Sequence, residues 1–164
     1  MRQITREDIQ VGEIVLSVDL AHGAVIEKFG ARHLDQPADW DAPGPVELWF
    51  YELPWGLQIT LECHLSVPVL NIYMDRLEVE AVLDYLNLRG HTYHLNTGMV
   101  ELLRTRCPAF FKDLNPTQLF RLDDNGNKFL IHTYESPRVA NYYQALYEGR
   151  GHKQLYWVEP AGAG

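Results

Sequence analysis

Cysteine is scarce in this chain of 164 residues: the two that occur, Cys63 and Cys107, form no Cys-x-x-Cys pattern. Two thiols cannot build the disulfide framework of a small secreted protein. Long apolar runs are missing as well. No stretch approaches the roughly 18 residues that a membrane-spanning helix needs, and the first residues lack the apolar core of a secretion signal. These absences predict a soluble protein of the bacterial cytoplasm that does not associate with membranes.

Motifs for nucleotide binding and nucleophilic catalysis are missing too. The glycine pair in Gly149-Arg150-Gly151 follows a predicted helix, whereas phosphate sites use the start of a helix. Ser17, Ser66 and Ser136 are the only serines, and none lies in a nucleophile-elbow context. We therefore expect a chain that is not an enzyme and that carries no cofactor.

Metal ligands are present but lack a convincing spacing. His91 and His94 are three residues apart, so on a strand they point to opposite faces. The segment 123–127 resembles a calcium loop, yet Arg121 stands where an oxygen ligand is needed and His132 stands in place of the bidentate glutamate. We interpret 123–127 as a turn and predict no metal site.

Basic residues are missing from one long stretch, and this is the most informative absence. From His33 to Asp75 there is no lysine or arginine, and the formal net charge of the whole chain is −8. The acidic residues of the stretch are Asp35, Asp39, Asp41, Glu47, Glu52, Glu62 and Asp75. Such a field repels nucleic-acid phosphates and attracts basic proteins, although an acidic surface can also serve only to keep a protein in solution.

The clearest structural pattern is a meander over residues 46–74. Pro54-Trp55-Gly56 supplies a turn, and the residues after it alternate strictly between apolar and polar up to Leu65. This alternation is typical of a half-buried antiparallel strand. Strands are also expected at 11–18, 117–122, 128–134 and 154–159.

Helices are predicted at three places, and a fourth segment is ambiguous. A capping box at Asp75-Arg76-Leu77-Glu78 begins a helix that ends near Leu88, a second helix spans 98–106, and Ser136-Pro137 begins a third that ends at Gly149. Residues 19–29 form either a short helix ended by Gly30 or a second strand, with a slight preference for the helix.

Together these patterns predict an α+β fold: an antiparallel sheet with a central meander (46–74) and three or four helices packed mainly on one of its faces. We expect one globular domain over residues 1–164 with a flexible tail from about residue 160. Composition supports a well-formed core, since 46% of the residues are hydrophobic and 12% are aromatic.

The functional hypothesis is a non-catalytic protein-binding module that captures a basic partner, in the manner of immunity proteins that neutralise cationic toxins. A tryptophan in a polar loop is typical of an interface, although it can also fold back onto a sheet. The residues predicted to bind the partner are Asp35, Asp39, Trp40, Asp41, Trp55, Glu62 and His64.

Two alternatives belong to other classes. A small-molecule-binding protein or enzyme would hold its ligand between the sheet and the helices, with Glu62, His64, Tyr73 and His132 as polar groups. A homodimer would pair through the exposed strand 154–158.

Overall fold

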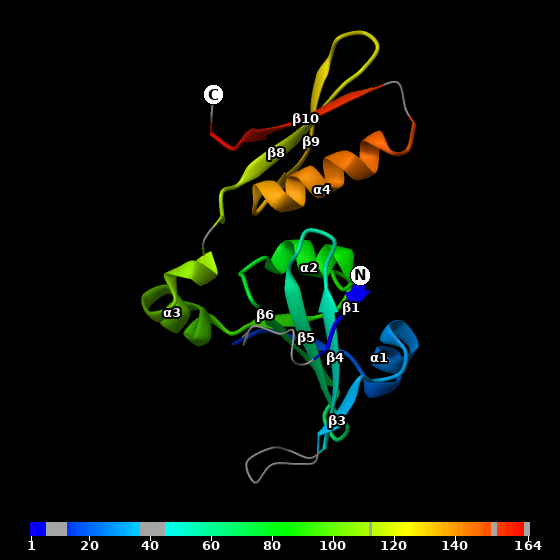
Figure 1. The fold of residues 1–164 in the computed structure, drawn as a ribbon, viewed down its shortest axis with the longest axis vertical. Coiled ribbons are helices and arrows are strands. Elements are labelled where there is room, and N and C mark those ends of the chain that lie inside the picture. The colour runs from blue at the N-terminus through cyan, green and yellow to red at the C-terminus, as the bar shows by residue number, and fades with distance from the viewer. Residues whose placement is uncertain (6–12, 37–44, 112, 152–153, 163–164) are drawn as a thin grey trace. The chain divides into compact units, whose positions relative to one another are not determined.

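A computed structural model describes residues 1–5, 13–36, 45–111, 113–151 and 154–162 of the chain. The elements, in chain order, are β1 (Arg2–Gln3), β2 (Glu13–Asp19), α1 (His22–Phe29), β3 (Leu34–Gln36), β4 (Val46–Glu52), β5 (Gln58–His64), β6 (Val69–Met74), α2 (Val79–Tyr85), β7 (Tyr93–Leu95), α3 (Thr97–Arg106), the 3-10 helix η2 (Pro108–Phe111), β8 (Thr117–Leu122), β9 (Lys128–Tyr134), α4 (Pro137–Glu148) and β10 (Leu155–Pro160) (Figure 1). Among the described residues, no helix is long and apolar enough to cross a membrane.

The chain divides into two compact units, and the backbone passes between them three times. Unit 1 holds residues 1–77 and 86–111, whereas unit 2 holds 78–85 and 112–164. Helix α2 therefore belongs to unit 2 although its sequence interrupts unit 1. The expectation of one globular domain over residues 1–164 stays a prediction, because two compact units can still fold together as one domain.

Unit 1 is built on a seven-stranded antiparallel sheet in the order β1-β4-β5-β6-β2-β7, with β3 also paired to β4. The predicted meander is confirmed as the adjacent strands β4, β5 and β6. In β5 the predicted alternation appears as alternate buried and half-buried residues. The α+β class with antiparallel sheets is thus confirmed.

A row of apolar side chains across four neighbouring strands forms the centre of unit 1. Trp49 pairs with Leu61, Leu61 with Ile72, and Ile72 with Leu16, and all four side chains are fully buried. Directly paired residues of antiparallel strands share a face, so these side chains contact one another in sequence. Burial of each aliphatic member contributes about 1.5–3 kcal/mol.

Helix α1 contacts β5 and β6, and aromatic side chains of β4 hydrogen-bond to its last turn. The Trp49 indole donates to the carbonyl of Gly30 at 3.2 Å, and the Tyr51 hydroxyl donates to the carbonyl of Phe29 at 3.1 Å. Gly30 follows the helix with φ of 78° and ψ of −160°, which lies outside the αL region of a usual helix terminator and is accessible mainly to glycine. The helical alternative for residues 19–29 is therefore confirmed, with the helix limited to His22–Phe29.

Unit 2 contains a three-stranded antiparallel sheet in the order β10-β8-β9, and α4 contacts all three strands (Figure 1). Ser136 accepts a hydrogen bond from the Val139 amide and Pro137 opens α4, as predicted. Because α1 and α3 contact the first sheet and α4 the second, the expectation that the helices pack mainly on one face of one sheet is not confirmed.

The start of α2 differs from the predicted capping box. The helix begins at Val79, and the carboxylate of Glu135 accepts from the amides of Glu80 and Ala81 at 3.1 and 3.2 Å. Asp75, the predicted cap, instead accepts from the Gln58 amide at 3.2 Å. The cap is supplied from the junction of β9 and α4, which no local sequence pattern reveals.

A second glutamate ties α2 to the same junction. Glu78 is 2% exposed and accepts a 2.9 Å hydrogen bond from the Ser136 hydroxyl. Burial raises the pKa of Glu135; the two amide hydrogen bonds oppose this shift, and the neighbouring charges of Glu78 and Glu80 add to it.

The first prediction concerns Glu135→Gln. A raised pKa means that the folded chain binds more protons than the unfolded chain at pH values above the ordinary 4.5. The Glu135 contribution to the free energy of unfolding therefore falls as pH rises through that window. Denaturant unfolding from pH 4.5 to 7 should show wild type losing stability relative to Glu135→Gln. Parallel profiles would contradict this, and the exposed Glu101→Gln is the control.

The second prediction concerns thiol reactivity. Cys63 is fully buried and Cys107 is exposed. Burial, with the nearby charges of Glu47 and Glu62, raises the pKa of Cys63 to about 11. A maleimide or disulfide reagent at pH 8 should modify one thiol in the folded protein and two in denaturant. Cys107→Ser should remove the fast-reacting thiol, and rapid labelling of that variant would show that Cys63 is accessible.

Candidate binding site

The residues predicted to bind a partner fall into three groups. Asp39, Trp40 and Asp41 lie outside the described residues. Asp35 lies in β3, where it pairs with Glu47 in register, and its side chain is not described. The remaining three are Trp55, Glu62 and His64. Of these, Trp55 is 7% exposed.

The described acidic side chains between residues 33 and 75 have more partners within unit 1 than the sequence alone indicates. The carboxylate of Glu47 contacts Arg32 at 3.0 Å and His22 at 2.8 Å, and Glu52 forms an ion pair with Arg2. Asp75 accepts from a backbone amide, as described above, and Glu62 lies in a hydrogen-bonded network. Each of the four acidic side chains that are described here is thus committed to contacts inside unit 1.

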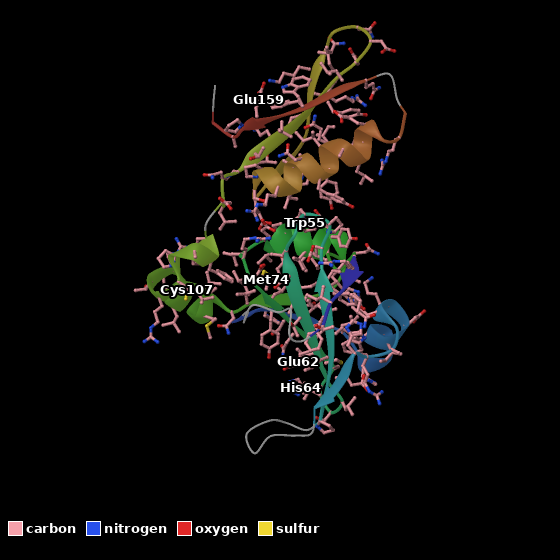
Figure 2. All side chains as sticks on the ribbon, in the orientation of Figure 1. Trp55, Glu62, His64, Met74, Cys107 and Glu159 are labelled. Atoms are coloured by element: carbon pink, nitrogen blue, oxygen red, sulfur yellow. The ribbon has the colours of Figure 1, made fainter. Side chains whose placement is uncertain are left out.

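Glu62, which Figure 2 labels together with His64, lies at the centre of a polar network on the sheet face opposite Leu61. Its carboxylate accepts from Asn71 at 2.9 Å, from the Tyr73 hydroxyl at 2.8 Å and from His64 Nε2 at 3.2 Å. The network continues from Asn71 Oδ1 to the Ser17 hydroxyl at 2.8 Å. Glu62, His64 and Tyr73 therefore converge, as the small-molecule alternative requires.

This convergence does not create a catalytic dyad. A carboxylate only accepts, so His64 Nε2 carries the proton of that hydrogen bond, and Nδ1 is the nitrogen left to act on a substrate. In the described part of the chain, Nδ1 is buried and has no hydrogen-bond partner. Ser17 donates to Asn71 rather than to the imidazole. Three hydrogen bonds therefore hold the Glu62 carboxylate in place.

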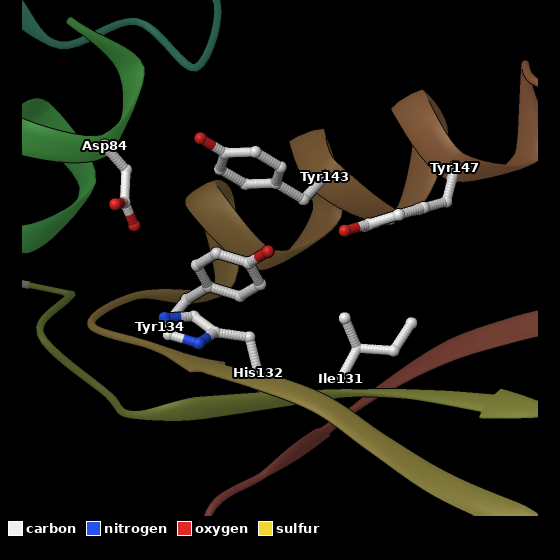
Figure 3. Close-up of a pocket in the computed structure, with 6 residues that line it drawn as sticks. All are labelled: Asp84, Ile131, His132, Tyr134, Tyr143 and Tyr147. Carbon is white, nitrogen blue, oxygen red and sulfur yellow. The ribbon is translucent and has the colours of Figure 1, made fainter. Parts of the chain in front are cut away.

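His132, the fourth polar group of that alternative, belongs to unit 2. It lies in a concave site of about 330 Å³ that we call the tyrosine hollow. The lining residues are Asp84, Ile131, His132, Tyr134, Tyr143 and Tyr147 (Figure 3).

A β-bulge explains why two consecutive residues of β9 line the tyrosine hollow. Leu119 pairs with His132 and Phe120 pairs with Leu130, which leaves Ile131 as the extra residue of β9. Side chains of a regular strand alternate between faces, and a bulge interrupts this alternation. Ile131 and His132 therefore both reach the hollow on the α4 side of the sheet.

The rings of the hollow are held by stacking. Tyr134 and Tyr143 are nearly parallel, at 8° with centroids 4.8 Å apart, and Tyr147 stacks on Tyr156 at 5.5 Å. His132 meets the Tyr134 ring edge-on at 4.7 Å. With their faces packed, Tyr134 and Tyr147 direct their hydroxyl groups toward the space between them, and the Tyr143 hydroxyl lies on the Asp84 side (Figure 3).

Charge in the hollow comes from Asp84. Burial raises the pKa of Tyr143 to about 12, and the Asp84 carboxylate contributes to the shift. Burial also raises the pKa of Tyr134, with contributions from Tyr147, Tyr143 and Asp84. Both phenols are therefore neutral at physiological pH, and they offer oxygen lone pairs without adding charge.

The other side of the unit 2 sheet carries a second feature, which we call the open face. Register places Leu155, Leu122 and Lys128 in one row across the three strands, and Trp157, Phe120 and Leu130 in the next. Leu130 is 52% and Leu155 61% exposed.

Aromatic and charged contacts organise the open face. Phe120 and Trp157 stack at 5.5 Å, and Lys128 Nζ lies 3.8 Å from the Phe120 ring centroid. Lys128 also contacts Glu159 at 3.0 Å. The face therefore combines exposed leucines with an aromatic pair and a balanced pair of charges.

Sequence reasoning missed both features of unit 2. His132 was singled out, but the three tyrosines come from β9 and α4 and Asp84 from α2, so no local spacing joins them. The signal that was present is the density of tyrosine between residues 134 and 147. The described residues contain no group of three or more histidine, cysteine or acidic side chains that could hold a metal ion.

Comparisons with protein-family models, curated proteins and solved structures gave no match.

The third prediction tests whether the hydrogen-bonded network around Glu62 stabilises the folded protein. Glu62→Ala leaves the donors of Asn71, Tyr73 and His64 without their acceptor, so it should lower the free energy of unfolding by about 2 kcal/mol. The exposed Glu101→Ala should change it by less than about 0.5 kcal/mol. Urea unfolding measures both, and equal small effects would show that the network contributes nothing to stability.

Proposed function

We propose that the chain is a non-catalytic protein-binding module that captures a basic partner, comparable to immunity proteins that neutralise cationic toxins. The observation that carries the proposal is the open face of unit 2. Leu130 and Leu155 are among the most exposed large apolar side chains described, and they flank the Phe120–Trp157 pair. Exposed apolar groups gathered around aromatic rings are typical of interaction surfaces.

The open face also has the anatomy of an interface hot spot. Trp157 and Phe120 are half-buried and supply a rigid anchor, while Lys128 and Glu159 supply charges beside it. Aromatic anchors within a polar rim dominate the binding energy of many protein complexes. Such a surface supports contact with another protein rather than turnover of a substrate.

The charge of the chain supports a basic partner. A net charge of −8 accelerates encounter with a cationic protein and slows encounter with an anionic one. Asp35, Asp39 and Asp41 stay candidates for this steering. Of the described acidic side chains of residues 46–75, Glu47 and Glu52 contribute less because each is paired with an arginine.

The alternative is a small-molecule-binding protein, and one observation favours it. The tyrosine hollow lies between β9 and α4 and measures about 330 Å³, which is the lower end of the range for small-molecule sites. A small amine that bound there tightly, with no protein partner, would support this alternative.

The fourth prediction tests the protein-binding proposal. Wild type, Leu130→Asp and the control Leu102→Asp, a similarly exposed leucine on α3, are titrated against a panel of small basic nuclease domains by calorimetry. Leu130→Asp should weaken the interaction at least about tenfold, because a charge replaces a desolvated apolar contact. Leu102→Asp should bind as wild type does.

Salt dependence completes this test. Raising the salt concentration from 50 to 300 mM should weaken binding to a basic partner by slowing association. Replacement of Asp35, Asp39 and Asp41 together by lysine should slow association further. Binding that survives Leu130→Asp unchanged, or the lack of any binder in the panel, would contradict the proposal.

A further inference from the structure

We infer that His33 is a pH-sensitive latch: its neutral imidazole holds the outer edge of β4, and protonation of the ring releases that hold. The outer edge is the side of β4 that faces away from β5, where β3 pairs with one end of the strand and β1 with the other (Figure 1). The latch belongs to unit 1 and is independent of the proposed function.

The hydrogen bond between Phe50 and His33 fixes the protonation state of the ring. The Phe50 amide donates to His33 Nδ1 at 2.9 Å. A backbone amide can only donate, so Nδ1 must offer its lone pair, and the proton of the neutral ring lies on Nε2. The imidazolium form carries a hydrogen on both nitrogens and has no lone pair to offer. Protonation of His33 and the hydrogen bond from Phe50 therefore exclude each other.

This hydrogen bond lies between two short strands on the outer edge of β4. Pairing with β3 covers residues 46–48 of β4, and pairing with β1 covers 51–52. Between them, the Phe50 carbonyl accepts from the Ile4 amide at 3.1 Å, and the Phe50 amide donates to the imidazole. The ring of His33 thus takes the place that a backbone acceptor holds elsewhere in the sheet.

His33 is attached to β4 at two points. Its amide donates to the Leu48 carbonyl at 2.9 Å, and its ring accepts from Phe50 two residues further along the strand. Leu48 and Phe50 belong to a buried apolar cluster with Ile4 and Val46. Loss of the ring acceptor leaves the amide of a buried residue without its partner, so we expect the backbone here to open toward water.

The surroundings of the ring favour its neutral form. The His33 and Tyr51 rings lie 5.0 Å apart in an edge-to-face arrangement, and the Phe50 ring lies 6.2 Å away. Burial lowers the pKa of His33. The Tyr51 hydroxyl donates to the carbonyl of Phe29 at 3.1 Å and is therefore committed to the end of α1.

The charged groups on the neighbouring elements already have partners. Arg2 of β1 forms an ion pair with Glu52, and Arg32 contacts Glu47 at 3.0 Å. His22 of α1 also contacts Glu47, through Nε2 at 2.8 Å. Because a carboxylate accepts from either form of the imidazole, protonation of His22 does not break that contact. Acid therefore breaks the hydrogen bond at the latch and keeps the one at Glu47.

The lowered pKa sets the direction of the response. The folded chain takes up the His33 proton at a lower pH than the unfolded chain, whose pKa is the ordinary 6.5. The stabilising contribution of the latch is therefore present above pH 6.5 and is lost as pH falls through the folded pKa. Because β3 directly follows His33 and carries Asp35, mild acid should loosen the strand that holds one of the predicted partner-binding residues.

NMR of the full chain between pH 5 and 8 tests the latch. Imidazole nitrogen shifts report the tautomer and the pKa of His33, and amide exchange rates, corrected for the intrinsic effect of pH, report protection of the Phe50 amide. We expect the Nε2–H tautomer and a pKa below the ordinary 6.5. Protection of the Phe50 and His33 amides should fall at least about fivefold on acidification.

Two substitutions at His33 separate the acceptor from the charge. His33→Asn keeps an acceptor oxygen at the position of Nδ1 but does not titrate, so Phe50 protection should stay high across the whole pH range. His33→Ala removes the acceptor, so Phe50 protection should be low at every pH. His91→Asn replaces an exposed histidine and, as the control, should leave the wild-type response unchanged.

Several results would overturn the latch. The Nδ1–H tautomer, or a His33 pKa at or above 6.5, would show that the ring is not held as an acceptor. Phe50 protection that does not change with pH would show that protonation releases nothing. A wild-type response that persists in His33→Asn would assign it to another group, and an equal loss of protection in β8 of unit 2 would show global unfolding instead.

Discussion

The tyrosine hollow of unit 2 depends on how helix α2 is held. Glu135 caps the first amides of α2, and Ser136 hydrogen-bonds to the buried Glu78 one residue before the helix. Because these two residues form the junction of β9 and α4, the same turn begins α4 and anchors α2. Asp84 reaches the hollow only as a member of α2, so the charge of the site rests on two hydrogen-bonded glutamates.

The two units differ in how their polar side chains are engaged. In unit 1 the carboxylates of two sheet residues are saturated: Glu47 contacts Arg32 and His22, and Glu62 accepts three hydrogen bonds. Saturated anions stabilise one arrangement of a sheet and have little capacity left for a ligand. In unit 2 the partly exposed Tyr143 and Tyr147 line a hollow together with the buried Tyr134.

Sequence reasoning predicted the local elements well where the pattern was local. The alternation after Gly56 predicted β5, the Asp123–Asn127 turn joined β8 and β9, and Ser136-Pro137 began α4. It failed where distant residues decide the outcome. Nothing near Asp75 reveals that Glu135 caps α2.

The candidate site was harder to predict than the fold for the same reason. Acidic residues that are close in sequence suggested one negative surface, but Glu47 and Glu62 lie on opposite faces of the sheet with separate partners. The tyrosines of the hollow come from two elements and Asp84 from a third. Their convergence requires the tertiary structure and the extra residue in β9, which leaves no trace in the hydrophobic pattern.

The bulge at Ile131 also determines which residues of β9 face each side of the unit 2 sheet. Leu130, before the bulge, faces the open face, whereas Tyr134, after the bulge, faces α4. In a regular strand, two residues four positions apart would face the same side. Loss of one residue here would rotate the rest of the strand by half a repeat and exchange what each side presents. A substitution in this hairpin arm therefore alters one surface, whereas a deletion alters both.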